Sequence, residues 1–222
     1  MPNILLESIE IETGPNPTHS VIWLHGLGAD GHDFAGIVPE LGLPASLAVR
    51  FVFPHAPVQP VTINGGMAMR AWYDIRVPNL VRSEDDKGIH ASEAAITALI
   101  EKENSRGVPT HRIVLAGFSQ GSAMTLHTGL RYPDTLAGLV ALSGYLPLAQ
   151  DAAQGWSDAN RQTPIFLAHG TFDQVVVFDR GTMTRDLLQT HHYKVDWHAY
   201  PMPHSVCPEE INDIGVFLKS IL

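Results

Sequence analysis

The chain of 222 residues has little cysteine, no long hydrophobic run and few basic side chains. Its one cysteine, Cys207, cannot form an internal disulfide, so nothing in the sequence indicates an oxidising compartment. No stretch approaches the ~18 apolar residues of a membrane span, and the N-terminus lacks the basic and apolar regions of a secretion signal. We therefore expect a cytoplasmic protein with no integral membrane segment.

The charge balance argues against a further class of protein. There are 23 acidic and 14 basic residues, which give a formal net charge of −9. An acidic surface repels phosphate backbones, so we expect no nucleic acid partner. Hydrophobic residues make up 45% of the chain and charged residues 17%, a composition typical of globular proteins. The length and the absence of repeats predict a single domain over residues 1–222.

Short apolar runs alternate with helical patterns along the chain. Runs typical of strands lie at 20–24, 50–53, 112–116, 138–142, 164–168 and 195–200, and helical patterns lie at 90–106, 122–130, 179–191 and 209–221. Continuous apolar strands that alternate with helices predict an α/β fold, with a mostly parallel central sheet and helices on both faces. The segment 4–11 alternates, which indicates an antiparallel edge strand.

The segment at about 54–88 is rich in proline and glycine and follows neither period. We interpret it as a long loop excursion over the end of the sheet where the strands finish. Loops of this length are uncommon unless they are functional or disordered. The apolar residues Met67, Met69, Trp72 and Tyr73 favour a binding role for it.

A serine lies between two glycines directly after the buried run at 112–116. In Gly117-Phe118-Ser119-Gln120-Gly121 a strand pattern stops and a helical pattern follows. A G-x-S-x-G motif in this context is typical of the nucleophile elbow, in which the serine is exposed on a sharp turn. The alternative is a glycine-rich turn that contains serine incidentally. Because a serine hydroxyl is a weak nucleophile, the first interpretation also requires a base and an acid.

His204 is the candidate base among 12 histidines. It follows the last strand, in a loop that we expect at the same end of the sheet as Ser119. Five other histidines flank predicted helices or lie in a predicted strand, which favours surface or packing roles for them. They are His90, His111, His191, His192 and His198.

Asp173 is the preferred acid because it follows the strand at 164–168 by only a short loop. Asp151, Asp179 and Asp196 are the other candidates, and capping of the next helix is the alternative role for Asp173. The resulting chain order of serine, aspartate and histidine is the order of the α/β-hydrolase fold.

The oxyanion donors should be backbone N–H groups. The residue after the nucleophile, Gln120, supplies one, and Leu27 in the His25-Gly26-Leu27-Gly28 loop is the natural choice for the other. We expect His25 and His169 to hold their loops by hydrogen bonds. We expect no metal site, because neither H-E-x-x-H nor a Cys-His spacing occurs.

Together the motifs HGLGADGHDF, AWYDI, GFSQGS, HGTFDQVV and MPHSV resemble the carboxylesterase/phospholipase family of α/β-hydrolases, which includes bacterial carboxylesterases and acyl-protein thioesterases. The stretch RFVFPHAPVQPVTINGG before AWYDI is most similar to the small bacterial carboxylesterases. The resemblance implies a catalytic triad of Ser119, Asp173 and His204, oxyanion donors at Leu27 and Gln120, and no cofactor. Bacterial members are often dimers, which leaves a homodimer open. Ser122 and Pro203 depart from the family, which usually has glycine at both positions.

The expected function is hydrolysis of small to medium acyl carboxylic esters through an acyl-enzyme. A thioesterase or a lysophospholipase would use the same triad, and a non-catalytic binding protein on a hydrolase scaffold is the alternative of another class. The substrate pocket is expected to draw on Met67, Met69, Trp72, Val175 and Val176, although each also fits a role in the core.

Overall fold

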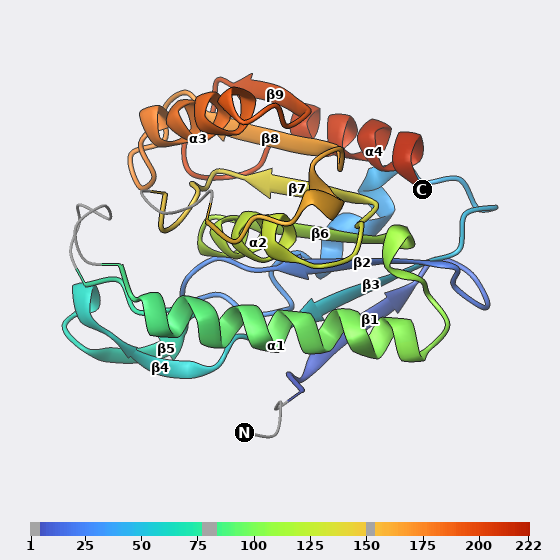
Figure 1. Cartoon of the computed structure of the whole chain (residues 1–222), viewed down its shortest axis with the longest axis horizontal. Helices are drawn as coiled ribbons and strands as arrows, with labels where there is room; N and C mark the ends of the chain where they lie inside the picture. The colour runs from blue at the N-terminus through green and yellow to red at the C-terminus, as the bar shows by residue number, and fades with distance from the viewer. Residues whose placement is uncertain (1–4, 77–83, 150–153) are drawn as a thin grey trace.

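A seven-stranded sheet forms the centre of the computed structural model, which describes residues 5–76, 84–149 and 154–222. Within these described residues, the strand order of the sheet is β1-β3-β2-β6-β7-β8-β9 (Figure 1). The strands are β1 (Ser8–Glu12), β2 (His19–Leu24), β3 (Val49–Pro54), β6 (Ile113–Phe118), β7 (Gly138–Leu142), β8 (Ile165–Gly170) and β9 (Val195–Tyr200). β1 pairs antiparallel with β3, and the remaining neighbours are parallel.

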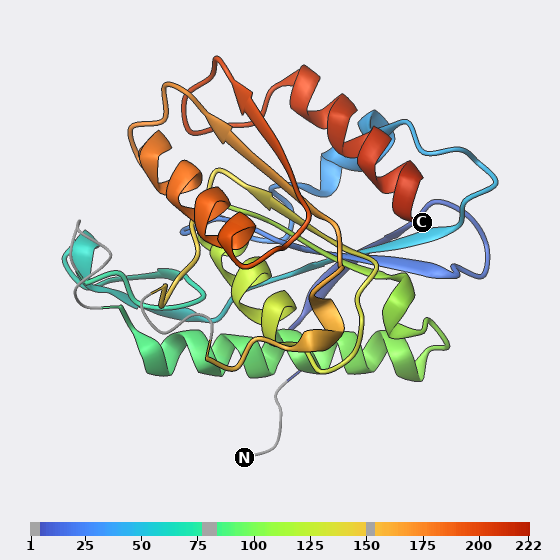
Figure 2. The same cartoon turned by 45° about the horizontal axis from the view of Figure 1, so that its top comes forward.

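Helices cover both faces of this sheet, as the sequence predicts. α1 (Asp86–Ser105), α2 (Gln120–Arg131) and α3 (Phe178–Thr190) lie on one face, and α4 (Pro208–Ile221) lies with the 3-10 helix η1 (Ala35–Leu41) on the other (Figures 1 and 2). Side chains of a strand alternate between these layers. In β2, Ile22 and Leu24 join the core under α1 and α2, whereas Val21 and Trp23 join the core under α4. Among the described residues, no helix is both long and apolar enough to cross a bilayer.

The element boundaries differ most from the prediction at the starts of α1 and of β1. α1 begins at Asp86 instead of residue 90. Its first turn brings Ile89 into the core, an apolar position seven residues before Ile96 that the predicted range left out. α2 begins at Gln120, directly after the serine turn. The expected antiparallel edge strand is present as β1, but it begins at Ser8, so the predicted start of the strand is wrong for residues 5–7, and residue 4 lies outside the described residues.

The excursion after β3 contains regular structure that its sequence pattern does not predict. β4 (Val58–Val61) and β5 (Met67–Arg70) form an antiparallel hairpin around the short 3-10 helix η2 (Thr62–Asn64). Pro60 within β4 and the two glycines of the turn hide its alternation from a pattern search. Figure 1 shows this hairpin at one end of the sheet, near the start of α1. Residues 77–83 of the excursion lie outside the described residues.

Candidate active site

Ser119 forms the turn between β6 and α2 in a conformation that suits glycine. Its φ is 55° and its ψ is −116°, and such a conformation strains a residue with a Cβ by about 1–3 kcal/mol. Close backbone packing explains the flanking glycines. A Cβ on Gly117 would lie 2.4 Å from the carbonyl group of Gly121, and a Cβ on Gly121 would lie 2.2 Å from the Leu24 oxygen. The turn therefore packs tightly against the end of β2 and leaves the Ser119 side chain exposed to a cavity.

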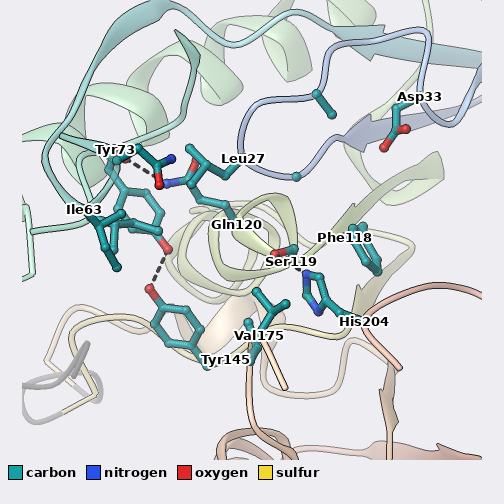
Figure 3. A pocket seen from close by; sticks show the side chains of 15 residues that line it. Leu27, Asp33, Ile63, Tyr73, Phe118, Ser119, Gln120, Tyr145, Val175 and His204 are labelled. Atoms are coloured by element: carbon teal, nitrogen blue, oxygen red, sulfur yellow. Dashed lines mark hydrogen bonds between the residues drawn. The ribbon is translucent and has the colours of Figure 1, made fainter. Parts of the chain in front are cut away.

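His204, in the loop between β9 and α4, lies between Ser119 and Asp173. Its Nε2 is 2.9 Å from Ser119 Oγ (Figure 3), and its Nδ1 is 2.6 Å from Asp173 Oδ2. When Nδ1 carries the proton and donates it to Asp173, Nε2 is free to accept the proton of Ser119. Pro203 precedes this histidine, and the imidazole reaches both partners with proline at that position.

Asp173 is fixed by its own loop. Its Oδ1 accepts hydrogen bonds from the N–H groups of Val175 (2.8 Å) and Val176 (2.9 Å), which leaves Oδ2 for the histidine. His169 Nε2 donates to the Val176 carbonyl oxygen (2.7 Å), so this histidine holds the loop, as its sequence position indicates. The carboxylate is fully buried, and its orientation toward His204 is therefore set by the backbone.

Among the described residues, the carboxylate that hydrogen-bonds His204 is that of Asp173. Asp179 lies in the first turn of α3. Asp196 lies in β9, where its Oδ1 is 3.0 Å from His198 Nε2. Asp151 lies outside the described residues.

Leu27 and Gln120 both line the cavity beside Ser119 (Figure 3). Gln120 is the first residue of α2, so its backbone N–H has no acceptor within the helix. The loop that carries Leu27 is held by Gly28, whose N–H donates to the Arg70 carbonyl oxygen (2.8 Å) and whose φ is 79°. The two residues therefore lie beside Ser119 at two separate strand ends, from which an oxyanion hole of this kind draws its donors.

His25 anchors the same loop to the segment that follows β3. Its Nε2 accepts a hydrogen bond from the Ala56 N–H (3.0 Å), so the proton is on Nδ1, which donates to the Gly26 carbonyl oxygen (2.7 Å). Burial lowers the pKa of His25, which keeps the ring neutral and able to act as both donor and acceptor. This is a structural role in the loop.

A cavity of about 510 Å³ opens beside Ser119 and His204, within the size range of small-ligand sites. Its wall is mainly apolar and includes Leu27, Ile63, Tyr73, Ile75, Phe118, Tyr145, Val175 and Val176 (Figure 3). Val175 and Val176 thus lie where the sequence places them.

Met67 and Met69 do not line this cavity, contrary to the prediction from the sequence. The Met67 side chain is 65% exposed on β5. The Met69 sulfur accepts a hydrogen bond from Asn64 Nδ2 (3.3 Å) within the hairpin. The reason is the β4–β5 pairing, which fixes the direction of both side chains.

The profile of the phospholipase/carboxylesterase family matches residues 6–222 of the chain. The chain belongs to the phospholipase/carboxylesterase family. Acyl-protein thioesterase 1 of Neurospora crassa is 46% identical over 92% of this chain and 87% of its own length. Acyl-protein thioesterase 1 of Yarrowia lipolytica is 44% identical over 91% of each chain. The family resemblance read from the motifs is therefore confirmed.

Solved structures of similar fold include two plant proteins. SOBER1 of Arabidopsis thaliana superimposes with a TM-score of 0.85 at 32% identity, covering 91% of this chain and 98% of its own. Acyl-protein thioesterase 2 of Zea mays gives a TM-score of 0.83 at 28% identity, covering 96% and 99%. These similarities confirm the α/β-hydrolase fold.

Trp72 has a different role in this phospholipase/carboxylesterase family member from the one predicted. Its side chain is 1% exposed and does not line the cavity. Its Nε1 donates to the His25 carbonyl oxygen (2.9 Å), and its backbone N–H donates to Gln120 Oε1 (2.8 Å). The Gln120 side-chain amide in turn donates to the Tyr73 carbonyl oxygen (2.8 Å). Trp72 therefore joins the excursion to the serine turn and to the loop at residues 25–28, and the substrate-binding prediction is corrected.

Two tyrosines form part of the cavity wall that the predicted pocket did not include. The hydroxyls of Tyr73 and Tyr145 lie 2.7 Å apart and hydrogen-bond across the cavity wall (Figure 3). Burial raises the pKa of both hydroxyls well above the usual range, so the pair stays neutral. Tyr73 lies in the AWYDI motif and could have been included on that basis, whereas nothing in the residues around Tyr145 distinguishes it from a core tyrosine.

Proposed function

We propose that this protein is a serine hydrolase that cleaves acyl esters and thioesters through an acyl-enzyme. The observation that carries the proposal is the hydrogen-bonded chain from Ser119 through His204 to Asp173 on a strained turn beside an apolar cavity. A binding protein on the same scaffold would not need a nucleophile, a base and an orienting acid that are hydrogen-bonded to one another.

The reaction has two steps. Ser119 Oγ attacks the acyl carbonyl carbon while His204 Nε2 takes its proton, and Asp173 holds the imidazole and stabilises the imidazolium. The N–H groups of Leu27 and Gln120 stabilise the oxyanion. The bond from the carbonyl carbon to oxygen or sulfur breaks, and His204 protonates the leaving group. Water, deprotonated by His204, then releases the acid and restores Ser119.

The cavity wall favours an acyl chain as the part of the substrate that is buried. Leu27, Ile63, Ile75, Val175 and Val176 offer apolar surface next to Ser119, and the neutral Tyr73–Tyr145 pair adds no charge. Each buried methylene of a chain contributes about 0.8 kcal/mol to binding. Val175 and Val176 belong to the same loop that orients Asp173, so the pocket and the triad share one segment.

The relatives favour a thioester as the bond that is cleaved. The two fungal relatives at 44–46% identity carry the name acyl-protein thioesterase 1, so we place S-acylated protein ahead of the simple carboxylic ester as the substrate class. A lysophospholipid would present the same acyl group to the same triad.

A serine-directed phosphonate probe tests the catalytic proposal. The parent protein should gain the mass of one adduct, and Ser119→Ala should gain none. Ser122→Ala is the matched control, because this serine lies one helical turn further on and is buried; it should label like the parent. Labelling that persists in Ser119→Ala would refute the assignment.

Matched substrates test the choice of bond. Oxygen esters and thioesters of the same acyl chain, in a series of increasing length, give kcat/KM for each leaving group. We expect the S-acyl peptide to be preferred over the p-nitrophenyl ester of equal chain length. A preference for the oxygen ester at every length would return the protein to the carboxylesterase class and leave the triad unaffected.

A further inference from the structure

A cluster of two histidines and a glutamate lies between α1 and α2. His90 and Glu93 are on α1 and His127 is on α2, and their ligand atoms all lie within 4.8 Å of one another. The i,i+3 spacing places His90 and Glu93 on one face of α1, and α2 packs beside this helix (Figures 1 and 2). None of the three residues lines the cavity at Ser119.

We propose that His90, Glu93 and His127 form a zinc site that ties α1 to α2. Glu93 Oε2 lies 2.8 Å from His90 Nδ1 and 3.2 Å from His127 Nε2. Tetrahedral zinc with bonds of about 2.1 Å separates its ligand atoms by roughly 3.4 Å. To reach the geometry of the bound metal, the first separation must therefore widen by roughly 0.6 Å and the second by roughly 0.2 Å.

Asp86 contacts the ring nitrogen of His90 that does not face the proposed metal. Its Oδ1 lies 3.2 Å from His90 Nε2, on the opposite side of the imidazole from Glu93. Histidines that bind a metal through one nitrogen commonly donate the other N–H to a carboxylate, which fixes the ring and its tautomer. Asp86 supplies that partner, one turn before His90 on α1.

Burial and donor chemistry favour a transition metal. His127 is fully buried, while the side chains of His90 and Glu93 are 53% and 24% exposed, so an ion enters from the solvent side. Two imidazoles and one carboxylate suit zinc, whereas calcium and magnesium take oxygen ligands. Water completes the coordination.

One feature limits the affinity. With zinc on Nε2, the proton of His127 moves to Nδ1, which is buried and has no hydrogen-bond acceptor in the described part of the chain. Arg131 also lies near this ring, and its charge is offset by Glu93. The sequence gives no sign of the site, because the third ligand comes from a helix 34 residues further along the chain.

Zinc titration of the full-length protein, after removal of metals with a chelator, tests the proposal. Calorimetry should give one bound Zn²⁺ per chain, and zinc should raise the melting temperature. His90→Ala, a solvent-exposed change that should preserve the fold, should lose both effects. Asp86→Asn should weaken zinc binding by about tenfold, because it removes only the supporting carboxylate. His111→Ala, a change at an exposed histidine outside the cluster, should bind zinc like the parent.

A second cluster provides the decisive comparison. Asp30, His32 and His55 also bring ligand atoms within 4.8 Å of one another. If zinc binding survives His90→Ala and is lost in His32→Ala, the proposal is refuted. It is equally refuted if the parent protein binds no zinc.

Discussion

Replacing Ser119 should separate the catalytic and the conformational roles of the serine turn. Ser119→Ala and Ser119→Gly both remove the hydroxyl and its hydrogen bond to His204. Both variants should therefore abolish hydrolysis, and the lost hydrogen bond should affect their stability equally. Neither loses a helix cap, because the Ser119 side chain makes no cap hydrogen bond to α2. The two variants differ only in the Cβ, which alanine keeps and glycine lacks.

The Cβ decides the expected order of stability. A φ of 55° with a ψ of −116° strains a residue with a Cβ by about 1–3 kcal/mol. Glycine relieves this strain but loses about 0.5–1 kcal/mol more backbone entropy on folding than alanine. The net expectation is that Ser119→Gly is more stable than Ser119→Ala by about 1 kcal/mol. For a domain of this size that difference corresponds to roughly 2–4 °C in melting temperature.

Thermal unfolding of the two variants, followed by circular dichroism under the same conditions, measures this difference. Ser122 supplies the control, since it lies inside α2, where the backbone is helical. There the order should reverse, with Ser122→Gly about 1 kcal/mol less stable than Ser122→Ala. If Ser119→Gly melts at or below Ser119→Ala, the turn is not strained and its serine has no conformational cost.

Three further variants test other parts of the structure. Asp173→Asn should lower kcat by about 10³–10⁴-fold with little change in folding, because it no longer holds the required tautomer of His204; a loss below tenfold in steady-state assays would exclude Asp173 as the orienting acid. Trp72→Ala should cost about 3–5 kcal/mol of stability in denaturant unfolding, without changing acyl-chain preference; altered preference at unchanged stability would restore the pocket role. Burial raises the pKa of Glu210 from 4.5 to about 8, so the native state keeps a proton that the unfolded chain releases above pH 4.5. Its contribution to stability is therefore complete below pH 4.5 and is lost as the pH rises to about 8. The melting temperature of Glu210→Gln should rise relative to the parent across this range, and a constant difference would contradict the assignment.

The sheet and the positions of its functional loops could be predicted because buried parallel strands leave a continuous apolar signature. β6 is buried and therefore apolar, and the glycines around Ser119 are needed because the backbone packs closely there. Both features can be read directly from a single sequence. Asp173 and His204 could then be chosen by their distance from a strand end, since parallel strands finish at one edge of the sheet.

The substrate pocket could not be predicted equally well, because it depends on side-chain direction in irregular backbone. Trp72 and Tyr73 are neighbours, yet Trp72 is buried behind the serine turn and Tyr73 faces the cavity. No period distinguishes them, since their directions are set by hydrogen bonds to Gln120. The predicted pocket roles of Met67 and Met69 are wrong for a similar reason. The directions of their side chains depend on the β4–β5 hairpin, which the sequence does not predict.

The attachment of the excursion through Gln120 bears on how this chain could be altered. The glutamine side chain binds only backbone atoms of residues 72 and 73, so it recognises the path of the chain and is indifferent to which side chains the segment carries. Residues such as Ile63 and Ile75 can therefore be exchanged to reshape the cavity wall while the serine turn keeps its geometry. An engineer could randomise these wall positions as a separate module and screen for new substrates without rebuilding the catalytic centre.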